Sequence, residues 1–117
     1  MTARMNTEET GRLGEDAAAR YLLRQGYTLL DRNFRCRLGE IDIIAREGDY
    51  LVFAEVKTRK NSRYAEAREY VTYSKQQRIL RAAKYWLMLH PEDVQVRFDV
   101  LEVYTDTNTI NLIRDAF

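Results

Sequence analysis

The run LVFAEVKTR (51–59) begins as an apolar segment and ends in a glutamate and a lysine two positions apart. Side chains alternate between the two faces of a strand, so Glu55 and Lys57 share one face with Phe53. A strand with this pattern buries its apolar part and projects an acid and a base from its end. The same pattern also describes an ordinary strand end whose charges reach solvent. A second acidic residue beside Glu55 would favour a functional site over this alternative.

Asp42, in the preceding segment GEIDIIARE (39–47), is such a residue if the two segments form a β-hairpin. A two-residue loop at 48–49 pairs residue 47 with residue 50 and places Asp42 directly opposite Glu55. A loop at 47–48 leaves the two carboxylates diagonal on one face, whereas a three-residue loop would put them on opposite faces. Glu40 is a competing carboxylate near the start of the same strand.

Two carboxylates in this register, with Cβ atoms about 5 Å apart, favour the binding of a divalent cation. Their charges repel, so one of them takes up a proton unless a cation lies between them. Oxygen ligands suit Mg²⁺ or Mn²⁺, which bind through a few carboxylates together with water and substrate phosphate. Lys57, about 6–7 Å further along the strand, would then contact the substrate or orient a water molecule.

Glu15 is a third acidic candidate, and it lies in a predicted helix at 6–25. It shares one helical face with Gly11, Gly14 and Ala18. A glycine inside a helix costs about 1 kcal/mol relative to alanine, so two of them predict close approach of the helix backbone to a neighbouring element. The alternative is an exposed glutamate in a frayed first turn.

Apolar periodicity along the chain predicts the order α-β-β-β-α-β-β, which is typical of an α/β sandwich around a mixed sheet. Gly26 ends the first helix, and Ser74 with Gln77 forms a capping box for the second. The predicted elements are a helix at 6–25, strands at 27–34, 39–47 and 50–57, a helix at about 75–89, a strand at 94–104 and an edge strand at 107–113.

The composition is that of one globular domain over residues 1–117, with residues 1–6 expected to be a flexible N-terminus. Hydrophobic residues make up 45% and charged residues 32% of the 117, which excludes a disordered chain. Neither a membrane span nor the apolar region of a signal peptide is present, so a cytoplasmic location is expected. A single cysteine excludes an internal disulfide and a cysteine-based zinc site.

Charge is distributed unevenly along the chain. The net charge is +1, yet residues 57–84 contain nine Lys or Arg against two Glu, a local balance of +7. Clustered positive charge favours an anionic partner, most commonly a nucleic acid. A hydrated helix face followed by a charged loop is the alternative explanation.

Several segments, in order, resemble the YraN family. They are GRLGEDAAARYLLRQGY, RNFRCRLGEIDIIAREGD, LVFAEVKTR, SKQQRILRAAKYWL and RFDVLEV, and together they cover about residues 11–103. YraN proteins are a largely uncharacterised bacterial group, similar to archaeal Holliday junction resolvases in the PD-(D/E)XK nuclease superfamily. The resemblance implies a restriction-endonuclease-like α-β-β-β-α-β core, with a mixed central sheet flanked by helices.

The resemblance also implies roles for individual residues in metal-dependent hydrolysis of phosphodiester bonds. Asp42 matches the aspartate of the superfamily motif, Glu55 and Lys57 match its (D/E)-x-K, and Glu15 matches its helix glutamate. Asp42, Glu55 and the carbonyl of Val56 would bind Mg²⁺ or Mn²⁺, with Glu15 contributing through water or a second ion. All four catalytic residues of the pattern are present, so it is intact in this chain.

The expected activity is that of a DNA endonuclease acting on branched DNA such as Holliday junctions, with RNA remaining open as a substrate. A catalytically silent nucleic-acid-binding or adaptor module on the same fold is the alternative. Resolving a junction takes two cuts, which implies a homodimer or two separately bound copies. The segment NTINLIRDAF (108–117) could either pair with a second chain or cap its own sheet. The residues expected to contact phosphate are Arg35, Arg37, Arg59, Lys60, Arg63, Lys75, Arg78 and Arg81.

Overall fold

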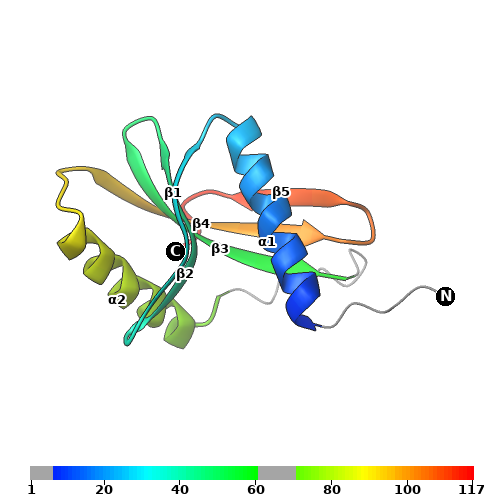
Figure 1. Ribbon diagram of the computed structural model, residues 1–117, viewed down its shortest axis with the longest axis horizontal. Helices are drawn as coiled ribbons and strands as arrows, with labels where there is room; N and C mark the ends of the chain where they lie inside the picture. The colour runs from blue at the N-terminus through cyan, green and yellow to red at the C-terminus, as the bar shows by residue number, and fades with distance from the viewer. Residues whose placement is uncertain (1–6, 61–70) are drawn as a thin grey trace.

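The computed structural model describes residues 7–60 and 71–117. The elements follow the predicted order, α-β-β-β-α-β-β, and they form a mixed α/β fold (Figure 1). They are α1 (Thr7–Arg24), β1 (Thr28–Cys36), β2 (Gly39–Glu47), β3 (Tyr50–Arg59), α2 (Tyr73–Leu89), β4 (Gln95–Tyr104) and β5 (Thr109–Ile113).

The five strands form one twisted sheet in the order β1-β2-β3-β4-β5. All neighbouring pairs are antiparallel except β3 and β4, which run parallel along ten residue pairs. A parallel pair needs a crossover connection, and α2 lies in that connection. The sheet is therefore mixed, as the sequence predicts.

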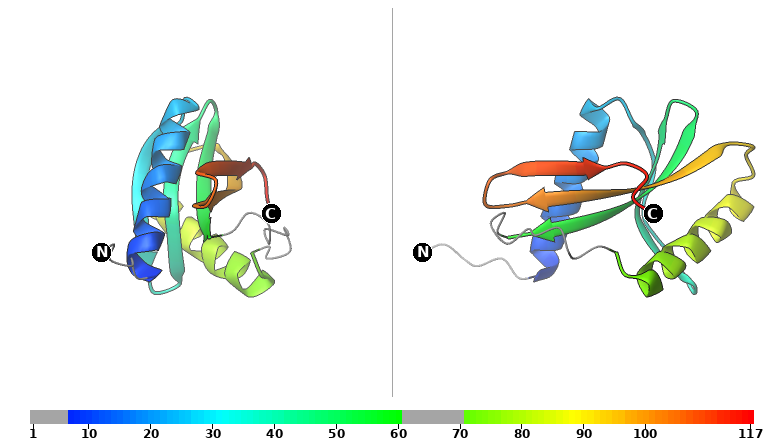
Figure 2. Two further views of the ribbon diagram at one scale, coloured as in Figure 1. Left: turned by 90° about the vertical axis from the view of Figure 1, so that its right-hand side faces the viewer. Right: turned by 180° about the vertical axis from the view of Figure 1, so that it is seen from behind.

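The two helices cover opposite faces of the sheet (Figure 2). On one face, Val52 and Ala54 of β3 pack with Ala18 and Leu22 of α1. On the other face, Phe53 packs with residues of α2 that include Ile79 and Trp86. The alternation of side chains along β3 therefore assigns Glu55, which follows Phe53 by two positions, to the α2 side.

The β2–β3 hairpin has the predicted register. Glu47 pairs with Tyr50 across the two-residue loop, and the ladder continues to Ile43 and Ala54. Gly48 in this loop has φ 56°, a left-handed conformation that glycine adopts without steric cost. The three-residue loop that would have separated Asp42 from Glu55 is excluded.

The predicted end of α1 is confirmed, whereas the predicted start of α2 is wrong. Gly26, at φ 91°, follows the end of α1 as predicted. The predicted capping box at Ser74 is wrong, because α2 begins earlier. Its N-cap is Thr72, whose hydroxyl accepts a hydrogen bond from the backbone N–H of Lys75 at 3.2 Å.

One glycine of α1 allows the helix to approach the sheet closely. A Cβ at Gly14 would overlap the hydroxyl of Thr58 on β3, so only glycine lets the helix lie at this distance. Among residues 7–60 and 71–117, nothing lies within 4 Å of such a Cβ at Gly11, so the close approach predicted there is wrong for this part of the chain. The fit at Gly14 fixes the position of the adjacent Glu15 beside β3.

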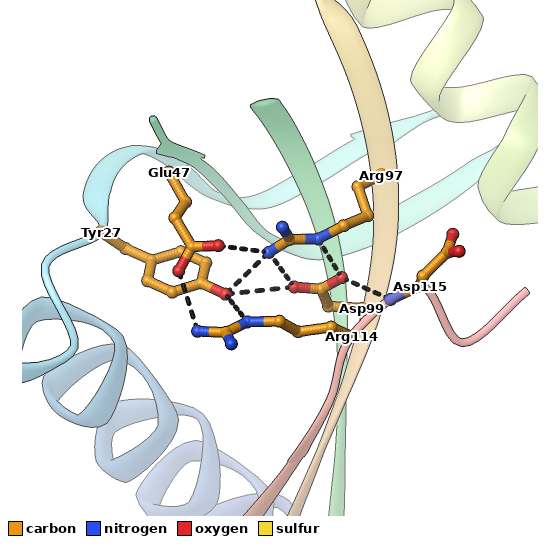
Figure 3. Close-up of polar contacts among 6 residues, drawn as sticks. All are labelled: Tyr27, Glu47, Arg97, Asp99, Arg114 and Asp115. Atoms are coloured by element: carbon orange, nitrogen blue, oxygen red, sulfur yellow. Dashed lines mark hydrogen bonds and ion pairs between the residues drawn. The ribbon is translucent and has the colours of Figure 1, made fainter. Parts of the chain in front are cut away.

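Polar side chains that are far apart in the sequence, from Tyr27 to Asp115, contact one another around Asp99 (Figure 3). We call this group the Asp99 cluster. The carboxylate of Asp99, fully buried on β4, accepts two hydrogen bonds from Arg97 at 2.8 and 2.9 Å. It also accepts bonds from the Tyr27 hydroxyl at 3.3 Å and the backbone N–H of Asp115 at 3.0 Å. The other members, Glu47 and Arg114, form an ion pair at 3.0 Å.

The C-terminal segment completes this sheet within the same chain. β5 pairs along β4, and the backbone N–H of Ala116 donates to the carbonyl of Phe98 at 2.7 Å. Phe117 stacks on Phe98 with ring centroids 5.3 Å apart. Across residues 7–60 and 71–117, neither helix is long and apolar enough to cross a membrane.

Candidate functional site

Asp42 and Glu55 meet where the β2–β3 ladder ends. The last paired residues are Ile43 and Ala54, and one further step in the same register reaches the two acids. Here the backbone N–H of Val56 donates to Asp42 Oδ2 at 2.8 Å. A side chain therefore replaces the backbone ladder, and the carboxylate of Asp42 is held beside β3.

The two carboxyl groups strongly affect one another. Glu55 is 5% exposed, and Asp42 is half-buried. Burial, followed by the negative charge of Glu55, raises the pKa of Asp42 to about 8, and the Val56 N–H offsets only part of this effect. At neutral pH and without a cation, a proton is therefore retained on Asp42 beside Glu55.

Lys75 of α2 supplies the positive charge closest to this pair. Its ammonium lies 2.5 Å from Glu55 Oε1, and its side chain is 41% exposed. Burial alone would lower the pKa of Lys75, but the hydrogen bond and the charge of Glu55 raise it overall. The start of α2 is thereby tied to β3 through an ion pair.

Lys57 lies two residues beyond Glu55 on the same side of β3. Burial lowers the pKa of Lys57, and the nearby ammonium of Lys75 lowers it further. The charge of Glu55 raises the pKa of Lys57, but by less than burial and Lys75 lower it. Two lysines therefore compete for one buried carboxylate, and Lys75 is the one that holds it.

Glu15 lies near the acidic pair but on the other side of β3. Together with Val56 and Thr58 it lines a hollow of about 280 Å³, closed by Thr10, Gly11 and Lys60. Burial raises the pKa of Glu15, and the charge of Arg32 and a hydrogen bond from Asn33 oppose this. Glu15 contributes only the smallest of the effects on Asp42, so it influences the pair from a distance.

The arrangement suits a cation held by two carboxylates rather than by three. Within the described residues, no three side chains of Asp, Glu, His or Cys converge on one point that could hold a metal ion. Mg²⁺ and Mn²⁺ do not need such a cage, because they bind through one or two carboxylates and keep several waters or phosphate oxygens. The raised pKa of Asp42 shows that this position favours added positive charge, which fits a divalent ion.

Comparison with known proteins gives the family of this chain. Residues 14–103 match the model of a family described as uncharacterised protein family UPF0102. The chain belongs to the UPF0102 family, also known as YraN. The predicted resemblance is thereby confirmed.

UPF0102 relatives match this chain over nearly its whole length. A UPF0102 protein of Caldicellulosiruptor bescii is 45% identical, covering 97% of this chain and all of the relative. One of Lachnoclostridium phytofermentans is 49% identical over 97% of this chain and 96% of the relative. One of Frankia casuarinae is 50% identical over 92% of this chain and 94% of the relative.

The basic residues expected to contact phosphate occupy different environments in this UPF0102 chain. Arg37, Arg81 and Lys60 are exposed, and so is Arg78. Arg35 lies 3.4 Å from Glu40 in an exposed ion pair. Arg63 lies outside the described residues.

Arg59 and Lys75 are engaged with buried acids instead of lying free at the surface. Arg59 Nε donates to Glu102 at 3.1 Å, and its side chain is 12% exposed. Asn111 donates to the other oxygen of Glu102 at 2.9 Å. The pairing of Arg59 supports a structural role, whereas the pairing of Lys75 places it in the acidic site.

The sequence interpretation missed that Lys75 belongs to the acidic site. Eighteen to twenty residues separate it from Lys57 and Glu55, and a crossover connection lies between them. The only sequence signal for this placement was that Lys75 lies at the start of the helix that follows β3. It also missed the Asp99 cluster, although Arg97 and Asp99 repeat on β4 the alternating charges of Glu55 and Lys57.

Proposed function

We propose that this UPF0102 protein is a divalent-metal-dependent endonuclease that hydrolyses phosphodiester bonds of DNA. The observation that carries the proposal is the acidic pair, Asp42 and Glu55. The two carboxyl groups are held together at the end of a hairpin, one of them with a pKa raised to about 8, beside two lysines. A protein that only binds nucleic acid gains nothing from two acids placed beside phosphates.

The fold supports this assignment at the level of topology. A helix, a three-strand meander, a crossover helix and a parallel fourth strand follow in the order expected for a restriction-endonuclease-like core. Asp42 lies on β2 and Glu55 on β3, which agrees with the positions expected from the PD-(D/E)XK pattern and supports the proposal. This order is also expected of a relative of the Holliday junction resolvases.

Asp42 and Glu55, with the carbonyl of Val56, would hold the metal ion, and Glu15 would contribute through water. When bound, Mg²⁺ or Mn²⁺ polarises the scissile phosphate and lowers the pKa of a bound water. The Val56 N–H fixes Asp42 Oδ2, so the carboxylate is oriented before any ligand arrives. A preoriented carboxylate loses little conformational freedom on binding a cation.

Lys57 would act on the substrate. Its ammonium lies on the same side of β3 as Glu55, within reach of a phosphate held at the acidic pair. There it stabilises the negative charge that develops at phosphorus, or it positions the attacking water. Burial of the side chain strengthens this electrostatic effect relative to an exposed lysine.

Exposed basic residues on α2 and in the β1–β2 turn would guide a duplex to the site. Arg78 and Arg81 are on α2, beyond Lys75, and Arg37 lies in the turn between β1 and β2. Contacts of this kind bind phosphates without reading bases, so they support affinity for DNA of any sequence. A branched substrate and a homodimer that makes two cuts are part of the same proposal.

A cleavage assay tests the proposal. Labelled four-way junction, flap, duplex and single-stranded DNA, together with single-stranded RNA, are incubated with the protein and Mg²⁺ or Mn²⁺. We expect wild type to cut DNA, with the four-way junction preferred. Lys57→Ala should lose about 10²-fold or more in rate, because a group that stabilises developing charge is removed.

The matched control for this assay is Lys84→Ala. Lys84 is an exposed lysine on α2 outside the acidic pair, so the variant should cut at the wild-type rate. Equal rates for Lys57→Ala and wild type would indicate a contaminating nuclease and contradict the proposal. Preferential cutting of RNA would change the substrate while keeping the chemistry.

A catalytically silent adaptor is the second candidate. The observation that favours it is the pairing of Glu55 with Lys75, which already supplies the acidic pair with positive charge. An adaptor would bind DNA with strong salt dependence and leave every substrate uncut in either metal. Cutting that depends on Lys57 excludes it.

A further inference from the structure

The ion pair between Lys75 and Glu55 places a lysine where the proposed metal site needs a divalent cation. Lys75 Nζ lies 2.5 Å from Glu55 Oε1, so its ammonium occupies one of the positions at which this carboxylate could bind a metal ion. The carboxylate is 5% exposed, so little bulk water competes for it. An ammonium on this carboxylate does electrostatically what a metal ion would do, with half the charge.

Lys75 pairs with only one of the two acids. Its ammonium contacts Glu55, whereas Asp42 accepts a hydrogen bond from the backbone N–H of Val56 at 2.8 Å. Lys57 lies on the same face of β3, but the ion pair of Glu55 is with Lys75. A divalent ion brings twice the charge of Lys75 and is the better counter-ion for both acids.

The position of Lys75 at the start of α2 allows its side chain to move between the acidic pair and solvent. Its backbone N–H is bonded to the N-cap hydroxyl of Thr72, so it lies in the first turn of α2. That turn has no acidic residue of its own, and Glu55 reaches it from β3. The side chain is 41% exposed, which leaves it a path from the acidic pair to solvent.

We propose that Lys75 is a built-in counter-ion of the acidic pair, which a divalent metal ion displaces, and which then turns to the phosphate of the substrate. This inference rests on the proposed function and adds the regulation of its metal site. Without metal, Lys75 keeps Glu55 charged and in place, so the site does not collapse. With metal, like charges repel, and the released ammonium faces the negatively charged backbone of DNA.

Chemical labelling of lysines tests the displacement in the wild-type protein without DNA. An amine-acylating reagent is applied with and without saturating Mn²⁺, and the extent of reaction at each lysine is measured by mass spectrometry of peptides. Calorimetry on the same sample records whether Mn²⁺ binds. Lys75 should become severalfold more reactive with Mn²⁺, because its ammonium is freed, while the exposed Lys84 stays unchanged.

The outcomes separate the inference from the proposed function. Binding of Mn²⁺ with unchanged labelling of Lys75 overturns the inference and keeps the metal site. Absence of Mn²⁺ binding overturns both. A rise at Lys75 and Lys84 alike reflects a general effect of the metal on the reagent or the fold, and it also overturns the inference.

A pair of variants gives a second, independent measurement. Lys75→Met keeps the length of the side chain and removes its charge, and Lys84→Met is the matched control on the same helix. Because the ammonium that pairs with Glu55 is gone, Lys75→Met should bind Mg²⁺ about tenfold more tightly than wild type. Equal or weaker binding by a folded Lys75→Met, or the same gain in Lys84→Met, overturns the inference.

Discussion

Two carboxylates of this protein, the buried Asp99 and the half-buried Asp42, have opposite surroundings. Asp99 is fully buried and accepts four hydrogen bonds, two of them from the guanidinium of Arg97. Asp42 accepts one backbone hydrogen bond and lies beside a second acid, and its pKa is raised to about 8. The first carboxylate is fully paired within the chain, whereas the second lies beside another acid that raises its pKa.

The difference separates a structural role from a chemical one. The Asp99 cluster joins the start of β1, the end of β2, β4 and the segment after β5, so its bonds hold distant parts of the chain together (Figure 3). Buried charges that are fully paired leave nothing for a ligand to bind. Under the proposed function, the acidic pair of Asp42 and Glu55 would bind a cation, and its perturbed pKa is typical of a functional site and not of a structural one.

Removal of charge at Asp99 should give the largest effect on stability. Asp99→Asn leaves Arg97 with only the partly exposed Glu47 as a charged partner, at 2.9 Å, and loss of a buried partner typically costs about 3–5 kcal/mol of the free energy of unfolding. Denaturant titration measures it. The control is Asp93→Asn, an exposed aspartate for which we expect a change within about 0.5 kcal/mol. If Asp99→Asn lowered the free energy of unfolding by less than about 1 kcal/mol, the Asp99 cluster would not have the structural role that distinguishes it from the acidic pair.

The acidic pair should respond to pH in the opposite sense from an ordinary salt-bridged acid. Folded, Asp42 holds its proton up to about pH 8, whereas an unfolded chain releases it near the ordinary aspartate value of about 4. Between these values the folded state binds more protons, so the free energy of unfolding falls as pH rises. We expect a loss on the order of a few kcal/mol across this interval in metal-free protein.

Asp42→Asn isolates this contribution, because it removes the titrating group and keeps the shape. Denaturant titrations of both proteins, at several pH values in the presence of a chelator, give the difference curve. The variant should be the more stable protein above about pH 8, where wild type carries two repelling carboxylates. Parallel curves for the two proteins would show that Asp42 titrates normally, and the contrast with Asp99 would disappear.

Much of this architecture could be predicted from the sequence because it depends on local patterns. The register of the β2–β3 hairpin follows from a two-residue loop with glycine, and counting residues back from that loop is enough to place Asp42 next to Glu55. The alternation of β3 assigns Glu55 and Lys57 to one face in the same way. Both inferences concern residues that are close in the chain.

Contacts between distant elements could not be predicted in this way. The pairing of Lys75 with Glu55 depends on how α2 lies against the sheet, and the position of Glu15 depends on which face α1 covers. The stripe of α1 indicated that Glu15 faces the sheet, but not that β3 separates it from Glu55. Three acids that a pattern groups together can therefore lie on two sides of one strand.

Metal binding by the acidic pair tests the central claim most directly. Mn²⁺ is titrated by calorimetry into wild type and into the Asp42→Asn, Glu55→Gln double variant, at a pH near the pKa of Asp42. We predict binding to wild type with release of protons, as Asp42 gives up the proton it retains, and no binding to the double variant. Equal binding by the two proteins, or none by wild type, would contradict the claim.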